Sequence, residues 1–315
     1  MLERDVELLM DTSPNGRMDD GWQSGVMRQR AKTIKAGRHL YLDSYPIWDT
    51  RTQRNAQERL KAVKQRSKEA MDKINARRAQ RKLEIIINAN FGPGDMLATC
   101  TYLDGQGPED EERAHKDMVN MIDRLRRVYT RYGKELRYIY VTEVQRSRKG
   151  DRYHHHMILS AGPSREEVET CWSDSRRKSK TGRGLCNTRR VQNLPEGLTG
   201  WAKYITKSAA GYGNAQEIAT RRRWCPSKNL VIPQPTVAEK KISRRRVEKI
   251  ASDLSADQAQ ARQILEKLYP GYELLECVVR TSSWVAGAYI SVIMVAKEVK
   301  VRYGQRRTGH PNRGG

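Results

Sequence analysis

The sequence predicts an α+β fold in which helices pack on a central antiparallel sheet. Three observations carry this prediction: apolar runs of strand length bounded by Gly and Pro, amphipathic stretches of helical period, and the order in which these segments alternate. That order is strand, helix, strand, strand, helix, strand, helix, which is typical of a ferredoxin-like arrangement. A basic helical region is expected before this core, and a small α+β extension after it.

The first ninety residues are assigned to a basic, partly helical N-terminal region (residues 1–90). Residues 1–50 carry Gly, Asp, Pro and isolated Trp without a clear period, and we expect an irregular arm there. Residues 51–88 are rich in Arg, Lys, Ala and Gln, with apolar residues at helical intervals, which predicts one or two helices with basic polar faces. Turn residues at 90–95 end this segment.

The core is assigned to residues 91–215. Its expected elements are strands over residues 96–102, 136–143, 153–160 and 185–191, and helices over residues 109–132, 164–172 and from 198 or 199 onward. The polar turn between the second and third strands favours a hairpin. Ser164 followed by Glu167 predicts a capping box at the start of the second helix.

The remaining chain is assigned to a C-terminal extension (residues 216–300) and a disordered basic tail (residues 301–315). Apolar residues at helical spacing over 243–268 predict one helix or two, and residues 274–280 and 288–295 predict a terminal hairpin. The tail is rich in Arg and Gly, a composition that does not bury a core.

The charge balance predicts a polyanionic partner. Lys and Arg number 60 against 37 Asp and Glu, so the formal net charge is +23. DNA or RNA is the simplest partner for such a chain, although a purely architectural basic protein has the same composition. We expect no secretory signal and no membrane partner, since no run approaches the ~20 apolar residues of a membrane span. Five scattered cysteines without C-x-x-C spacing fit a reducing cytoplasm, which we expect to be that of a bacterial host.

Three adjacent histidines lead into the third predicted strand. On a strand, side chains two residues apart share a face, so His154 and His156 can bind one metal ion while His155 faces away. The predicted hairpin would bring Glu143 near them. Two imidazoles and a carboxylate leave other positions of a divalent ion open to water and substrate, and such an ion can polarise a phosphate. We therefore predict His154, His156 and Glu143 as metal ligands.

A tyrosine and a lysine follow on the last helix of the core. Tyr204 and Lys207 are three residues apart and share a helix face. A free phenol ionises near pH ~10, so a nucleophilic tyrosine needs a cation or metal nearby. Lys207 can supply that charge or bind the scissile phosphate. This spacing occurs by chance in many helices, and its significance comes from its place after the predicted metal site.

With these motifs in this order, the sequence resembles the single-tyrosine HUH endonucleases that initiate rolling-circle replication. The matching segments are residues 99–102, Glu143 with residues 154–159, and residues 204–207. The resemblance is greatest to the replication-associated proteins of bacterial plasmids and integrated elements, akin to the gene II protein of filamentous phage. One position departs from the family pattern, because the middle of the histidine motif is normally a bulky apolar residue and here is His155.

The resemblance implies a mechanism and its partners. Tyr204 would attack a metal-bound phosphate in single-stranded or supercoiled origin DNA, with Lys207 as its charge partner and Mn or Mg as the ion. The products would be a 5′-phosphotyrosyl link and a free 3′-hydroxyl. No G-x-x-x-x-G-K-[ST] motif occurs, so helicase and DNA polymerase would come from the host. Basic helices and the loop over residues 178–190 would bind the DNA backbone, and Tyr212 is interpreted as structural.

Three alternatives stay open at this point. Another HUH enzyme, a relaxase or a transposase, would use the same residues and differ in its target. A non-catalytic basic nucleic-acid-binding protein would bind DNA equally well after Tyr204→Phe and form no covalent adduct. An iron oxygenase with two histidines and one carboxylate fits the ligand set, but the charge of +23 and the tyrosine with its lysine argue against it.

Overall fold

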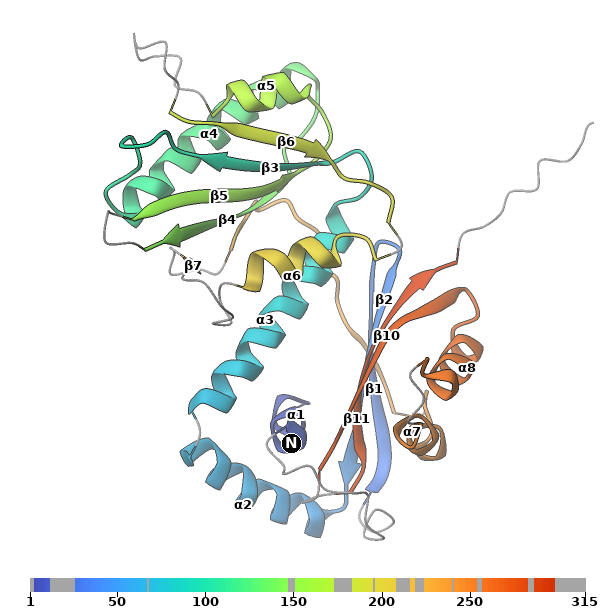
Figure 1. The fold of residues 1–315 in the computed structure, drawn as a ribbon. Coiled ribbons are helices and arrows are strands. Elements are labelled where there is room, and N and C mark those ends of the chain that lie inside the picture. Colours follow the sequence, from blue (N-terminus) through green and yellow to red (C-terminus); the bar gives the residue numbers. More distant parts are fainter. Residues whose placement is uncertain are drawn as a thin grey trace, which may run out of the picture.

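A computed structural model of the chain shows two antiparallel sheets with helices packed on both (Figure 1). The predicted α+β class is thus confirmed. Within the described ranges, no helix is long and apolar enough to cross a membrane. The structure describes residues 3–11, 26–66, 68–146, 151–172, 183–194, 196–207, 216–218, 224–239, 241–253, 257–282 and 286–297.

The first sheet, here called the core sheet, has the strand order β6-β3-β5-β4-β7, and β8 also pairs with β4. Its strands are β3 (Met96–Thr101), β4 (Tyr138–Gln145), β5 (Arg152–Leu159), β6 (Cys186–Arg190), β7 (Gln216–Ile218) and β8 (Cys225–Pro226). Helix α4 (Glu111–Arg131) joins β3 to β4, and α5 (Arg165–Thr170) joins β5 to β6. Each helix therefore crosses over one intervening strand, which produces the ferredoxin-like order that the sequence predicts.

Strand alternation sorts the core sheet into two apolar faces. Met96, Ala98 and Cys100 point to the side of α4 and α5, where Met118 and Leu125 of α4 pack against them. The helices begin where the sequence places capping residues. Asp110 caps α4, and the capping box of Ser164 with Glu167 is present at α5.

The other face of the core sheet is covered by α3 (Lys68–Asn90) and α6 (Thr199–Lys207). Leu83 and Ile87 of α3 join Ile205 of α6 and Ile158 of β5 in one apolar cluster. Figure 1 shows α3 running from this face down to the second sheet, so a single helix contacts both layers of the molecule.

The second sheet, here called the flanking sheet, has the order β10-β11-β2-β1-β9. Its strands are β1 (Val26–Ala36), β2 (His39–Trp48), β9 (Thr236–Ala238), β10 (Tyr272–Thr281) and β11 (Ala288–Ala296). Strand β11 pairs with β2, so the two ends of the described chain meet in one sheet. Helices α1 (Glu3–Asp11) and α2 (Thr50–Arg66) cover one face, and α7 (Arg244–Ala251) and α8 (Ala259–Leu268) cover the other.

The expectation of an irregular arm over residues 1–50 is wrong for the described parts of that segment. Residues 26–48 form the β1–β2 hairpin around a turn at Gly37, whose φ is +56°. The cations that suggested a solvated arm are compensated by a residue far along the chain. Arg28 and Arg30 form ion pairs with Glu239, at 2.6 and 2.5 Å.

The remaining predicted elements lie close to their expected positions. The interval 243–268 forms two helices, and the terminal hairpin is β10 with β11. Trp172 is fully buried in the core beside α4. Tyr212, most of the predicted basic loop and the C-terminal tail lie outside the described residues.

Candidate active site

The register of the core sheet brings the predicted ligands to one place. Strands β4 and β5 form the expected antiparallel hairpin, in which Glu143 pairs with His154. Strand β3 lies on the other side of β5 and sets Thr99 opposite His156. Because side chains alternate along a strand, Glu143, His154 and His156 all lie on the face that α3 and α6 cover.

The closest contact at this face joins a histidine and a carboxylate. His156 Nε2 lies 3.4 Å from Glu143 Oε2, and the two residues are only 7% and 2% exposed. The other ring nitrogen, Nδ1, lies 3.3 Å from Thr99 Oγ1. Among the described residues, none forms a hydrogen bond with the buried Nε2. This nitrogen is therefore open to a further ligand beside a carboxylate.

His154 completes the predicted set. Its ring centroid lies 6.2 Å from that of His156, and burial lowers the pKa of His154 although the nearby Glu143 raises it. Over the described part of the chain, no three His, Cys, Asp or Glu side chains are arranged to hold a metal ion together. The three predicted ligands thus share one face of the sheet without converging on a single point.

His155 points to the opposite face and is fully buried. Its Nδ1 hydrogen-bonds Thr142 Oγ1 and its Nε2 hydrogen-bonds the Tyr102 hydroxyl, each at 2.9 Å, while Trp172 packs against its ring. Burial lowers the pKa of His155 to about 3, so the ring is neutral. A neutral histidine with both nitrogens bonded therefore occupies the position where the resembling family carries a bulky apolar residue.

Tyr204 lies over the histidine face of the sheet. Its ring meets that of His156 edge to face, with centroids 5.5 Å apart and planes at 88°. The residue is 54% exposed, so solvent reaches it from the side away from the sheet. Helix α6 ends at Lys207, whose side chain lies outside what the structure describes.

A buried polar network holds the first turn of α6. Thr199 donates a hydrogen bond to Glu84 Oε1 (2.9 Å), and the backbone N–H of Leu198 donates to Asn88 Oδ1 (3.1 Å). Tyr41 of β2 donates to the same Glu84 oxygen (3.1 Å). Helix α3 and the flanking sheet thereby fix the helix that carries Tyr204.

Sequence reasoning missed this network, although one signal for it exists. Glu84 and Asn88 lie one helical turn apart within an otherwise apolar stretch of α3, and both are buried. A charged residue in such a stretch requires a partner from elsewhere in the fold.

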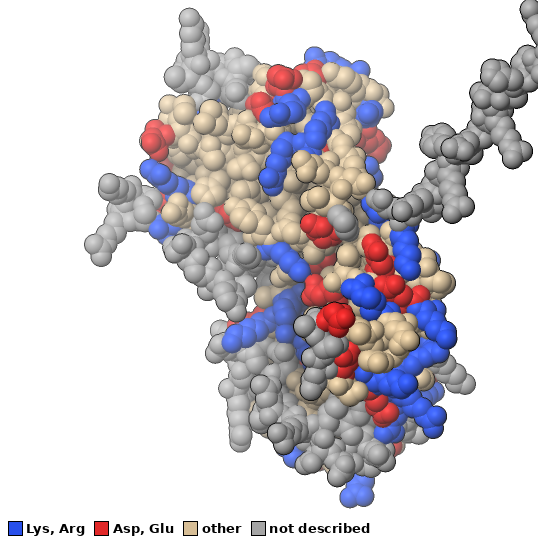
Figure 2. Space-filling view, turned by 45° about the vertical axis from the view of Figure 1, so that its right-hand side comes forward, with Lys and Arg blue, Asp and Glu red and all other residues tan. Residues whose placement is uncertain are grey.

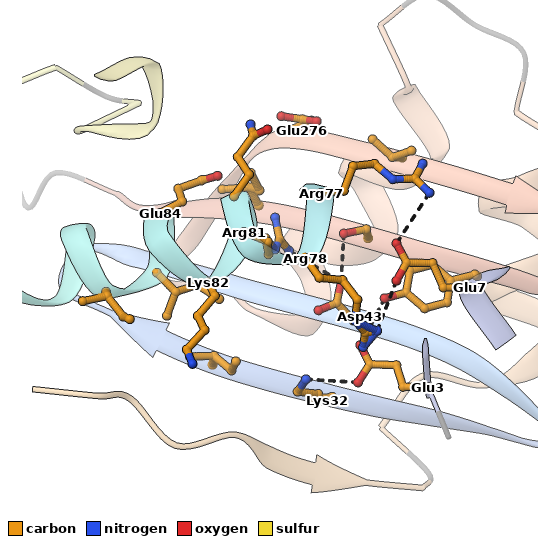
Figure 3. A pocket seen from close by; sticks show the side chains of 18 of the residues that line it. Glu3, Glu7, Lys32, Asp43, Arg77, Arg78, Arg81, Lys82, Glu84 and Glu276 are labelled. Atoms are coloured by element: carbon orange, nitrogen blue, oxygen red, sulfur yellow. Dashed lines mark hydrogen bonds and ion pairs between the residues drawn. The ribbon is translucent and has the colours of Figure 1, made fainter. Parts of the chain in front are cut away.

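A second link joins α6 to the flanking sheet. Lys203 forms an ion pair with Glu276 of β10 at 3.2 Å. Both line a cavity of about 440 Å³ between α3 and the flanking sheet. Figure 3 shows that many charged groups in this cavity face one another, for example Lys32 with Glu3 (3.0 Å). The cavity is thus largely internally neutralised and joins elements of the structure.

Comparison with known proteins agrees with this placement of the site. Residues 95–209 match the family model of the replication-associated proteins of the ORF2 and gene 2 protein type, over just over a third of the chain. The matched segment runs from the start of β3 to the end of α6 and includes all five predicted site residues. Searches of curated proteins and of solved structures found no match. The family match supports a role in the initiation of DNA replication.

Proposed function

We propose that the chain is a metal-dependent nickase and strand-transferase that cuts single-stranded origin DNA to start rolling-circle replication. The observation that carries the proposal is the contact between the rings of Tyr204 and His156, on the face that also holds Glu143 and His154. The match to a replication-associated family favours replication over plasmid transfer or transposition.

In the proposed reaction the Tyr204 hydroxyl attacks the phosphorus of the scissile phosphodiester. A bond forms between the phenolic oxygen and phosphorus, and the bond from phosphorus to the 3′ oxygen breaks. The phenolic proton passes to solvent, and the departing 3′ oxygen takes up a proton. Because one phosphodiester replaces another, a 3′-hydroxyl can reverse the step, which permits strand transfer after nicking.

His154, His156 and Glu143 would hold the divalent ion, Mn or Mg. The fit is supported by the buried His156 Nε2, which lies beside a carboxylate and is not hydrogen-bonded among the described residues. When bound, such an ion polarises a phosphate oxygen and offsets the charge of the transition state. Thr99 orients the His156 ring through Nδ1, and Lys207 is proposed as the charge partner of Tyr204.

The proposed substrate is single-stranded or supercoiled origin DNA, and the half-exposed Tyr204 ring leaves access for a strand. A base can stack on such an aromatic side chain while the phosphate is positioned. Host helicase and DNA polymerase would extend the 3′-hydroxyl in a bacterial cytoplasm.

The direct test is a covalent adduct. Single-stranded oligonucleotides that tile the replicon are incubated with the protein and manganese, and a denaturing gel separates free from protein-linked DNA. We expect an adduct with the wild type and with Tyr132→Phe, an exposed control tyrosine on the far side of α4. Tyr204→Phe should form none and keep most of its DNA affinity. An adduct that survives Tyr204→Phe refutes this assignment.

A further inference from the structure

Helices α7 and α8 form a basic groove on the outer side of the flanking sheet. This α7–α8 groove has a volume of about 530 Å³ and is lined by Ser243, Arg245, Arg246, Lys249, Gln263, Ile264, Lys267 and Leu268. Half of these residues are cationic and none is acidic. The two helices cover the face of the sheet opposite to α1 and α3, and so lie away from the helix that carries Tyr204 (Figure 1).

The helical period explains why the cations face outward. Val247 and Ile250 of α7 are buried against the flanking sheet. This arrangement leaves Arg245, Arg246 and Lys249 exposed on the outer side. Ile264 and Leu268 of α8 are half-buried and form an apolar floor between the two rows of side chains.

The cations of the groove differ from their neighbours in lacking partners. Arg244 pairs with Glu248 at 2.7 Å, and Arg262 pairs with Glu266 at 3.2 Å. In the described part of the chain, the four cationic residues of the groove form no ion pair with another described residue. The carboxylates nearest in sequence are thus engaged elsewhere, and the groove keeps a positive charge that an anion would offset.

We propose that the α7–α8 groove binds the phosphate backbone of double-stranded DNA. The inference rests on the proposed function, since a nickase that cuts a single strand at an origin also needs a hold on the adjoining duplex. Figure 2 shows Lys and Arg along the outer edge of the lower half of the molecule, with Asp and Glu nearer its middle. Cations placed this way attract an extended polyanion.

The lining of the groove favours duplex DNA over a single strand. Sites for single strands carry aromatic side chains on which exposed bases stack, and the described lining of this groove contains none. Arg245 and Lys249 are four residues apart, about 6 Å along the helix axis, and Lys267 adds a cation from the second helix. The charges are therefore spread over more than one phosphate.

The test compares two variants that lose the same charge. The groove variant is Arg245→Gln/Arg246→Gln/Lys249→Gln. The control is Arg51→Gln/Arg54→Gln/Lys61→Gln, which removes three exposed cations from α2. Duplex affinity is measured by fluorescence anisotropy over a range of salt concentrations, and adduct formation on single-stranded origin DNA is measured in parallel. Circular dichroism melting confirms that both variants fold.

We expect the groove variant to lose about tenfold or more in duplex affinity, and its salt slope to flatten by about three, one for each lost phosphate contact. Its adduct yield on single-stranded DNA should match the wild type, and the α2 control should keep its duplex affinity. If duplex affinity is unchanged in the groove variant, or falls equally in both variants, the inference is overturned.

Two further outcomes separate the possible causes. Loss of binding to anionic phosphatidylserine vesicles with intact duplex affinity would assign the groove to a membrane surface and overturn the inference. If no protein forms an adduct but the groove variant alone loses duplex affinity, the proposed nicking fails while the groove inference is supported.

Discussion

The hydroxyl of Thr199 donates a hydrogen bond of 2.9 Å to the Glu84 carboxylate, and both side chains are buried. Thr199 begins the helix that carries Tyr204, and Glu84 belongs to the helix that spans both sheets. The position of Tyr204 over the histidines therefore depends on a contact made by residues that do not touch them.

Thr199→Val should weaken this contact without changing the volume of the side chain much. Loss of a buried hydrogen bond to a carboxylate costs about 1.5–3 kcal/mol of unfolding free energy, which urea denaturation measures. Adduct formation should slow while affinity for single-stranded DNA stays close to wild type. Thr199→Ser should restore the rate, and Thr170→Val, at an exposed helix position, should change neither quantity. An unchanged rate in Thr199→Val would show that the contact does not position Tyr204.

Removal of a proposed metal ligand should abolish both adduct formation and metal binding. For His156→Ala or His154→Ala, manganese should no longer raise the melting temperature, because a ligand stabilises only the state that binds it. Glu143→Gln should behave similarly. A chelator should abolish the adduct in the wild type, and added Mn or Mg should restore it. His115→Ala changes an exposed histidine on α4 and should keep the response to manganese. Equal manganese stabilisation of wild type and His156→Ala would contradict the ligand assignment.

His155→Leu tests which histidines form the ligand pair. The substitution leaves the Thr142 hydroxyl without its imidazole partner, and we expect a loss of about 1–3 kcal/mol in unfolding free energy. At temperatures where the protein stays folded, adduct formation should persist, because His155 lies on the opposite face from Tyr204. A folded His155→Leu protein that no longer binds manganese would make His155 a ligand.

Gly37→Ala tests the packing of the β1–β2 turn against α3. A Cβ at Gly37 would lie 2.2 Å from the backbone oxygen of Asn88, and the residue has φ +56°. Gly94 has φ +91° and open space around it, so Gly94→Ala carries the backbone strain alone, of order 1–3 kcal/mol. Urea denaturation should show a clearly larger loss for Gly37→Ala than for Gly94→Ala. Equal losses would mean that the turn can move away from α3 at little cost.

The core of the fold could be predicted because its signals are local. The β4–β5 hairpin needs only two neighbouring runs and a polar turn, and the capping box at α5 needs only Ser164 and Glu167. From strand alternation and this hairpin, the nearness of Glu143 to His154 also follows.

The flanking sheet could not be predicted in the same way. Strand β2 pairs with β11, about 250 residues later, so no local pattern reports the contact. The buried network at Thr199 was missed for a related reason. On a long basic helix, polar residues such as Glu84 and Asn88 suggest a solvent-facing surface until the packing of α6 buries them.

The most direct test of the proposed chemistry is to locate the DNA on the protein. After reaction with origin DNA and manganese, the adduct is digested with nuclease and protease, and mass spectrometry identifies the peptide that carries the nucleotide. The account predicts a 5′-phosphotyrosyl group on Tyr204 and an unmodified 3′-hydroxyl on the released strand. A nucleotide on another residue, such as Tyr212, or a cut strand without any linked peptide would contradict it.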